Sequence, residues 1–179
     1  VTTGSNNTAV GTQSGDAINT GEHNSLFGHQ SGTSIQLGRY NSAFGYQSLN
    51  SEQHGSYSTA LGYKALYAQV HGSVNGDTGN VGVGNQAGFY NVTGTNNTYV
   101  GSGSGYGANG QSNTNNTAVG YNSLYAIRDG GSNVAVGSEA LDNLTSGSFN
   151  VAIGSLALSA EDTASSSIAI GYKSLEVQN

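Results

Sequence analysis

Residues 133–140 read Asn-Val-Ala-Val-Gly-Ser-Glu-Ala, and residues 150–157 read Asn-Val-Ala-Ile-Gly-Ser-Leu-Ala. The same pattern, an Asn or Ser followed by three residues and a glycine, occurs ten times along the chain. These anchoring glycines are 17 residues apart, except for one interval of 22 and one of 19. They are Gly11, Gly28, Gly45, Gly62, Gly84, Gly101, Gly120, Gly137, Gly154 and Gly171. A fixed period of this length predicts an all-β, parallel β-solenoid of about ten 17-residue coils, a single domain over residues 1–179.

The three residues before each anchoring glycine are the predicted strand. The last of them is apolar in every copy, and the first and last share one face. We predict that this face lines the lumen, with Val10, Phe44, Val119, Val136, Ile153 and Ile170 among its members. The middle residue is Ala in seven copies and is predicted to face outward. A small apolar row on an outward face indicates packing against another surface, for which a second copy of the chain is a candidate.

Other positions of the repeat also keep their character. The Asn or Ser four residues before the glycine is expected to bond its equivalents up the stack. Leu stands four residues after the glycine in six copies, as a predicted lumen filler. A second glycine ten residues after the first is expected to make a second sharp turn through positive φ. Apolar residues between the two turns predict a second, weaker strand: Ile18, Ile35, Val92, Ile127 and Leu144.

Composition excludes several classes of function. The chain has no Pro, Cys, Met or Trp, so it has no disulfides and no thiolate chemistry. Ten acidic residues against four basic ones, without a basic run, argue against nucleic acid as a partner. No apolar stretch approaches the ~18 residues of a membrane span, so no membrane insertion is predicted. Low charge with abundant Gly and Ser also occurs in disordered linkers, but the period argues against disorder.

The repeats resemble a known family. Residues 167–174, Ser-Ile-Ala-Ile-Gly-Tyr-Lys-Ser, and residues 133–140 are similar to the head repeat of YadA-type trimeric autotransporter adhesins, roughly N-S-x-A-x-G-x-x-S. The resemblance covers all ten copies, although the 17-residue period is longer than is usual there. It implies a left-handed parallel β-roll and a side-by-side homotrimer. Stretches such as residues 116–124 are also similar to repeats of phage tail fibres and other surface fibres.

The resemblance implies a non-enzymatic, extracellular adhesin or fibre segment. Such a segment sits on a cell surface or a virion fibre, and a cell-surface glycan or matrix protein is its expected partner. The alternative is a purely structural spacer or shaft, which needs the same stiff stack. The chain is expected to be a fragment of a longer fibre, because the repeat is already under way by Asn7. A bacterial adhesin and a phage fibre are not distinguished by these residues.

Catalytic and metal-binding patterns were sought without result. The four histidines lie in separate repeats and lack the spacing of metal ligands. Asn75-Gly76-Asp77 and Asp129-Gly130-Gly131 match neither an EF-hand nor a calcium-binding β-roll. Glu161-Asp162 is the only adjacent pair of carboxylates, and it sits in a predicted turn. We therefore predict no enzymatic activity, no cofactor and no metal.

Two features are candidate binding sites. Tyr46, Tyr63, Tyr121 and Tyr172 recur directly after the anchoring glycine, where they can stack on sugar rings or cap the coil. The 22-residue interval contains five extra residues, and His71, Asn75 and Asp77 lie in or beside them. Insertions in solenoids leave the coil as loops that can carry binding, although a tolerant turn also accumulates them without function.

Overall fold

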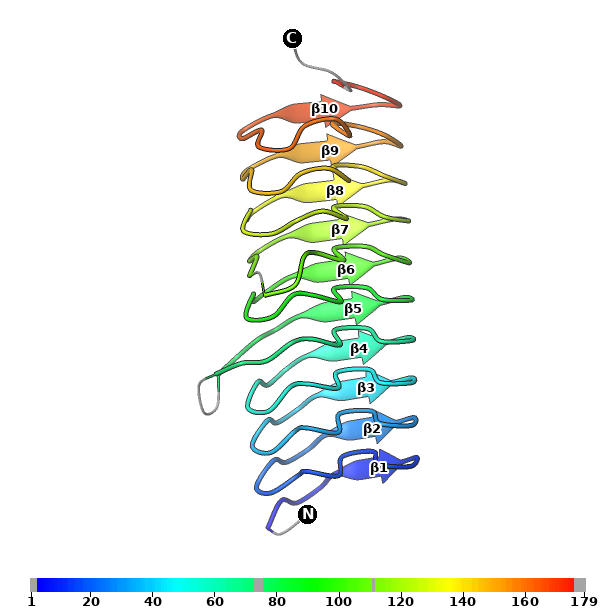
Figure 1. Cartoon of the computed structure of the whole chain (residues 1–179), viewed down its shortest axis with the longest axis vertical. Helices are drawn as coiled ribbons and strands as arrows, with labels where there is room; N and C mark the ends of the chain where they lie inside the picture. The colour runs from blue at the N-terminus through cyan, green and yellow to red at the C-terminus, as the bar shows by residue number, and fades with distance from the viewer. Residues whose placement is uncertain (1–2, 73–75, 111, 176–179) are drawn as a thin grey trace.

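The computed structural model of the chain describes residues 3–72, 76–110 and 112–175. Within these residues ten strands form one parallel sheet in sequence order, and the coils stack into a straight column with the termini at opposite ends (Figure 1). The strands are β1 Thr8–Val10, β2 Ser25–Phe27, β3 Ser42–Phe44, β4 Thr59–Leu61, β5 Val81–Val83, β6 Thr98–Val100, β7 Thr117–Val119, β8 Val134–Val136, β9 Val151–Ile153 and β10 Ile168–Ile170. Coil n below is the coil that holds strand βn. The predicted parallel β-solenoid is confirmed.

Each strand pairs in register with the strand of the next coil. Ala135 of β8, for example, lies between Ala118 of β7 and Ala152 of β9. The predicted second strand is not found in the part of the chain that the structure describes, where turns connect the ten strands. The turns are held by hydrogen bonds between coils, as where Leu37 N donates to Gln53 O over 3.0 Å. None of the described residues belongs to a helix long and apolar enough to cross a membrane.

The predicted orientation of the strands is wrong. The middle residue of each strand from β2 to β10 points into the lumen and is at most 2% exposed where it is Ala. The residues on either side of it point outward. The six residues predicted to line the lumen are all exposed, from Val119 and Val136 at 36% to Ile170 at 68%, with Val10, Phe44 and Ile153 between. The outward face of the sheet is therefore the apolar one.

Side-chain volume explains this orientation. In coils 3, 4 and 7–10 the middle residue is Ala, and Leu stands four residues after the anchoring glycine. Five of these leucines are fully buried, as predicted: Leu49, Leu66, Leu124, Leu141 and Leu158. They fill the lumen opposite the strand, which leaves room only for a methyl group on the strand itself. A Val or Ile pointing inward would overpack the coil.

In coils 2 and 6 the large side chain stands on the strand, and the small residue stands four places after the anchoring glycine. Leu26 and Tyr99 replace the strand Ala, and the leucine column becomes glycine both in their own coils and in the coils before them. A Cβ added at Gly32 would lie 2.8 Å from Leu26 Cδ2, and one added at Gly88 would lie 2.8 Å from Tyr99 Cδ2. Gly32 has φ +57° and Gly88 has φ +64°, values that glycine adopts freely and leucine does not. Leu141, at φ +52°, therefore fills the lumen at the cost of backbone strain.

The predicted asparagine ladder is confirmed. Asn24 Oδ1 accepts from Asn41 N over 3.0 Å, and Asn24 Nδ2 donates to Gly38 O over 2.9 Å. Both partners lie toward the next coil. Asn133 makes the same pair of bonds, with Asn150 N and Gly147 O. The buried amides thus satisfy backbone groups at the corner that precedes each strand.

The glycine ten residues after the anchoring glycine is required for a different reason from the one predicted. Gly21, Gly38, Gly55, Gly94, Gly130 and Gly147 are absent from the positive-φ residues. A Cβ at Gly21 would instead lie 2.6 Å from the carbonyl oxygen of Gly38 in the next coil. Close approach between coils, and not a left-handed backbone, requires glycine at this corner.

Candidate functional site

The first part of the tyrosine row is a stacked aromatic corner. Tyr46 stacks on His29 below and on Tyr63 above, each pair with centroids 5.4 Å apart and planes 8° apart. Beside the rings, Gln47 Nε2 donates to Gln30 Oε1 over 2.6 Å. The coil spacing brings these rings together, because each occupies the same position of its own coil. The structure thus joins Tyr46 and Tyr63 in one feature, with His29 added.

Tyr121 and Tyr172 lie apart from that corner. Serines occupy the same position in the coils on either side of Tyr121, namely Ser102 and Ser138. Tyr172, in the last coil, is 71% exposed, and Lys173 Nζ lies 5.8 Å from its ring centroid. The four predicted tyrosines therefore form one stacked pair and two separate rings.

Stacking changes what each tyrosine can bind. A sugar ring packs on the face of an aromatic ring. Both faces of Tyr46 are covered by its neighbours, so it offers only its edge and its hydroxyl group. Tyr121 has no aromatic neighbour in its row, and its ring is 55% exposed. Face-on contact with a sugar thus suits Tyr121 and Tyr172 better than Tyr46.

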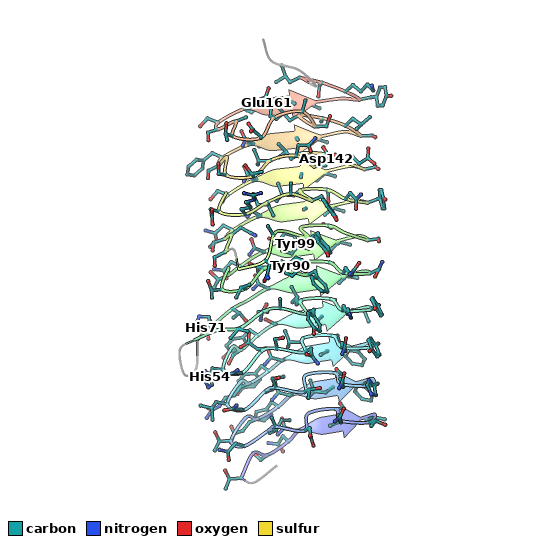
Figure 2. The ribbon with its side chains drawn as sticks, in the orientation of Figure 1. His54, His71, Tyr90, Tyr99, Asp142 and Glu161 are labelled. Atoms are coloured by element: carbon teal, nitrogen blue, oxygen red, sulfur yellow. The ribbon has the colours of Figure 1, made fainter. Side chains whose placement is uncertain are left out.

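The described residues on either side of the inserted segment, 71–72 and 76–77, lie between strands β4 and β5 in the chain. Figure 2 shows His71 at one side of the stack, with His54 close to it in the view. Asp77 forms an isolated parallel bridge with Ser56, and Gly76 O accepts from Ser56 N over 3.0 Å. Asn75, the third predicted residue, lies outside the described residues. His71 and Asp77 therefore stand at the base of the insertion.

A buried carboxylate holds this base. Glu52 is fully buried, and its Oε1 atom accepts from the backbone nitrogens of Gln53, His54, Gly55 and His71 at 2.7–3.1 Å. Its Oε2 atom accepts from Gln69 Nε2 over 2.9 Å. Hydrogen bonds to a carboxylate are among the stronger ones in proteins, and they offset part of the cost of its burial. Glu52 thereby fixes the turn of its own coil to the point where the inserted segment leaves the next one.

Gln69 extends this polar contact through the lumen. Its Nε2 atom also donates to Ser58 Oγ over 2.9 Å, and its Oε1 atom accepts from Asn80 Nδ2 over 3.0 Å. Ser58 Oγ in turn lies 2.6 Å from Thr78 Oγ1. These side chains are all buried. They carry the asparagine ladder across the coil in which Ser58 replaces Asn.

Sequence reasoning missed this polar core. Seven residues after the anchoring glycine, the first five coils have Ile18, Ile35, Glu52, Gln69 and Asn91. The next four coils have Ala108, Ile127, Leu144 and Glu161. Aligning the repeats on this position shows the change from aliphatic to polar side chains. Val92, which we predicted in the second strand, stands one place after this position, and Asn91 is the fully buried residue of its coil.

A second aromatic ladder was also missed. Tyr67, Phe89, Tyr106 and Tyr125 stack with centroids 4.9–5.2 Å apart, and Tyr90 packs edge-on against two of them. Burial, with the nearby phenols of Tyr90 and Tyr125, raises the pKa of Tyr106. Asp142 occupies the same position in the coil after Tyr125, where burial and then Glu139 raise its pKa. The signal was available in the sequence, since the four ladder residues and Asp142 each stand five places after an anchoring glycine.

Comparisons with protein-family models, with curated proteins and with solved structures found no match to this chain.

Proposed function

We propose that this chain is a non-enzymatic segment of an extracellular fibre, in which three parallel copies pack side by side, and that the fibre contacts a cell-surface glycan or matrix protein. The observation that supports the proposal best is the outward face of the sheet. Its two rows hold no charged residue in any of the ten copies. The row directly before the anchoring glycine is Val, Phe, Leu or Ile in every copy, and the row at the start of the strand is Val or Ile in four copies and Thr or Ser in six. A continuous apolar face of this kind is typical of a protein–protein interface.

The size of this face fits the proposal. Ten coils at the inter-strand spacing span ~48 Å, and the six residue steps across the strand and its flanks span ~20 Å. The product is about 1,000 Å² per copy, which a trimer divides between two neighbours, so each of the three interfaces buries about 1,000 Å² in total, near the lower limit for a specific interface. We predicted association through the Ala row, but that row lies in the lumen. The proposed contact is therefore made by the outward rows that contain Val and Ile.

Sedimentation velocity at micromolar concentration tests the association. The unmodified chain is expected to sediment as a trimer. Val136→Lys with Ile153→Lys places two charges on the outward face and should weaken association at least tenfold. Asn143→Lys, at an exposed position away from that face, is the matched control. A monomeric unmodified chain with a normal β-sheet circular dichroism spectrum would refute the proposal.

A glycan and matrix-protein array on the assembled chain tests the contact with a cell surface. Tyr121→Ala with Tyr172→Ala removes the two rings that have no aromatic neighbours, and should reduce glycan binding more than Tyr46→Ala with Tyr63→Ala. Loss of binding only in the second variant would place the contact at the stacked corner instead.

The alternative function is a structural spacer. It is favoured by the stacking of Tyr46 and Tyr63, because aromatic rings that cover one another's faces stabilise the stack without any ligand. An associated chain that binds nothing on the array would support this alternative.

A further inference from the structure

Two rows of side chains border the outward face of the sheet. The first, which we name the leading rim, is the residue five places before each anchoring glycine, just ahead of the strand. The second, the trailing rim, is the residue directly after the glycine, just beyond the strand. Because all strands run in one direction, each rim follows one side of the column for its whole length (Figure 1).

Both rims carry aromatic ladders in coils 2, 3 and 4. On the leading rim, His23 stacks on Tyr40 at 4.9 Å and Tyr40 stacks on Tyr57 at 5.2 Å. On the trailing rim the ladder is His29, Tyr46 and Tyr63. All six rings are exposed. In coils 5–8 the leading rim has Gly79, Asn96, Asn115 and Ser132, and the trailing rim has Asn85, Ser102, Tyr121 and Ser138.

This coincidence has a consequence for copies that pack side by side. A parallel, cyclic arrangement places the leading rim of one copy against the trailing rim of the next. Without axial displacement, aromatic rings meet aromatic rings in all three coils. An antiparallel pair would place like rims together and oppose the rings of coils 2–4 to Phe149, Ser132 and Asn115.

Identical interfaces close into a ring only when neighbouring copies have no axial displacement, whereas displaced copies form an open array. The aliphatic rows do not distinguish these two arrangements by themselves. In coils 7–10 the row before the anchoring glycine is Val119, Val136, Ile153 and Ile170, so a slip by one coil replaces each residue with a near equivalent. The same slip would leave one unmatched ring in each aromatic ladder, with Tyr57 opposite Asn85 and His29 opposite Asn6.

We propose that the two aromatic ladders of coils 2–4 form a clasp between neighbouring copies of this chain and set their axial register. The partner is a second copy of the chain, parallel and without axial shift. This inference rests on the side-by-side association proposed above, and it adds which residues meet and what aligns them. It also assigns His23, Tyr40 and Tyr57 a role that the sequence repeat did not indicate.

Disulfide cross-linking measures the register directly, because the chain has no cysteine of its own. Ser132→Cys with Ser138→Cys places one thiol on each rim of coil 8, far from the clasp. Ser132→Cys with Ser155→Cys is displaced by one coil. Within one chain the two rims are ~20 Å apart by strand length, beyond the ~7 Å limit between the Cα atoms of a disulfide, so any link joins two chains. Copper phenanthroline accepts the electrons as two thiols lose their protons and form the bond.

In the otherwise native chain, the in-register pair should cross-link at least fivefold faster than the displaced pair. Replacing Tyr40, Tyr57, Tyr46 and Tyr63 with Ser should bring the two rates within twofold. If that fourfold variant fails to fold, Tyr40→Ser with Tyr57→Ser on one rim provides the same test. Equal rates in the native chain, or a rate ratio unchanged by removal of the rings, would overturn the clasp.

Sedimentation of the same variants before oxidation separates the two proposals. Association with equal cross-linking rates overturns the clasp alone. A monomer overturns the side-by-side association, and the clasp with it.

Discussion

Coils 3–5 and coils 7 and 8 share one backbone and have opposite interiors. Around coils 3–5 the lumen holds Glu52, Gln69 and Asn91. Gln69 bonds to Glu52, Ser58 and Asn80. Asn91 stands apart from this cluster, and its Nδ2 atom donates to Gly94 O over 3.2 Å. In coils 7 and 8 the corresponding positions hold Ile127 and Leu144, which belong to one apolar cluster with Leu124, Leu141 and Leu158. The strand geometry is the same in both. The comparison shows that backbone hydrogen bonds between coils define the shape of the coil, whereas either polar or aliphatic side chains can fill its lumen.

The polar lumen should be the more sensitive of the two to truncation. Glu52→Ala leaves four backbone N–H groups and the Gln69 amide without their acceptor. Each buried unsatisfied group costs about 1–3 kcal/mol, so we expect a loss of about 4–6 kcal/mol in the free energy of unfolding. Urea denaturation measures it. The matched control is Ile127→Ala at the same position of coil 7, with an expected loss of about 2–4 kcal/mol. A smaller loss for Glu52→Ala than for Ile127→Ala would contradict the account.

The aliphatic lumen should obey a rule of volume exchange. Ala135→Leu in the native chain should destabilise it by about 1–3 kcal/mol, because Leu124 and Leu141 already fill the space. In the background Leu124→Gly with Leu141→Gly, the same substitution should stabilise the chain, since it rebuilds the arrangement of Gly15, Leu26 and Gly32. Thermal or urea unfolding of the four variants gives the sign of the coupling. The same sign in both backgrounds would show that the two columns do not share the lumen.

The left-handed backbone offers a sharper test of the same coils. Ala is normally about 1 kcal/mol better than Gly inside regular structure, but at φ +52° that order reverses. Leu141→Gly should therefore be at least as stable as Leu141→Ala, although both lose about 2–4 kcal/mol to the cavity. Urea midpoints of the two variants check this prediction. A clearly less stable glycine variant would indicate that the turn relaxes away from its left-handed conformation.

Tyr99, between the two regions, should give a smaller effect that depends on pH. Its hydroxyl donates to the buried Asn113 Oδ1, so Tyr99→Phe should cost about 1–2 kcal/mol at neutral pH. Burial raises the pKa of Tyr99 above its unfolded value. The stability it contributes is therefore complete below pH 10 and is lost as the pH rises further, because the unfolded chain ionises first. The alkaline unfolding of Tyr99→Phe should start at higher pH than that of the native chain.

The smallest effect is expected from shortening the insertion. Deleting residues 72–76 restores a 17-residue interval and retains His71 and Asp77, which stand at the base. Loop length alone changes stability by under about 1 kcal/mol. Circular dichroism and urea unfolding measure that change, and the glycan array measures binding. Loss of array binding with unchanged stability would place the contact in the insertion.

Period and strand positions followed from the sequence because they repeat ten times, and so did the asparagine ladder. Which face of the strand points into the lumen did not follow from the sequence. Val134, Ala135 and Val136 are apolar on both faces, so only side-chain size decides between the two orientations. The informative signal was the exchange between Leu26 and Gly32, and between Tyr99 and Gly105, across the lumen. Glu52 was missed because it stands in the variable half of the repeat, where only an aligned column shows it. Tyr46 and Tyr63 were placed correctly, but their mutual stacking depends on the distance between coils.

The asparagine ladder also gives the stack a direction of growth. Each Asn of the ladder directs its carbonyl oxygen and one amide hydrogen toward the following coil, as Asn133 does toward Asn150 N and Gly147 O. Asn133 Nδ2 also donates back to Asn116 Oδ1 over 3.1 Å. A finished coil therefore presents a donor and an acceptor that only its C-terminal neighbour satisfies. During synthesis, which proceeds from the N-terminus, each new coil would therefore satisfy the hydrogen-bonding groups that the preceding coil leaves free. Ser58 interrupts the ladder because it replaces Asn. Gln69 and Thr78 hydrogen-bond to Ser58, and Gln69 connects it to Asn80 of the next coil.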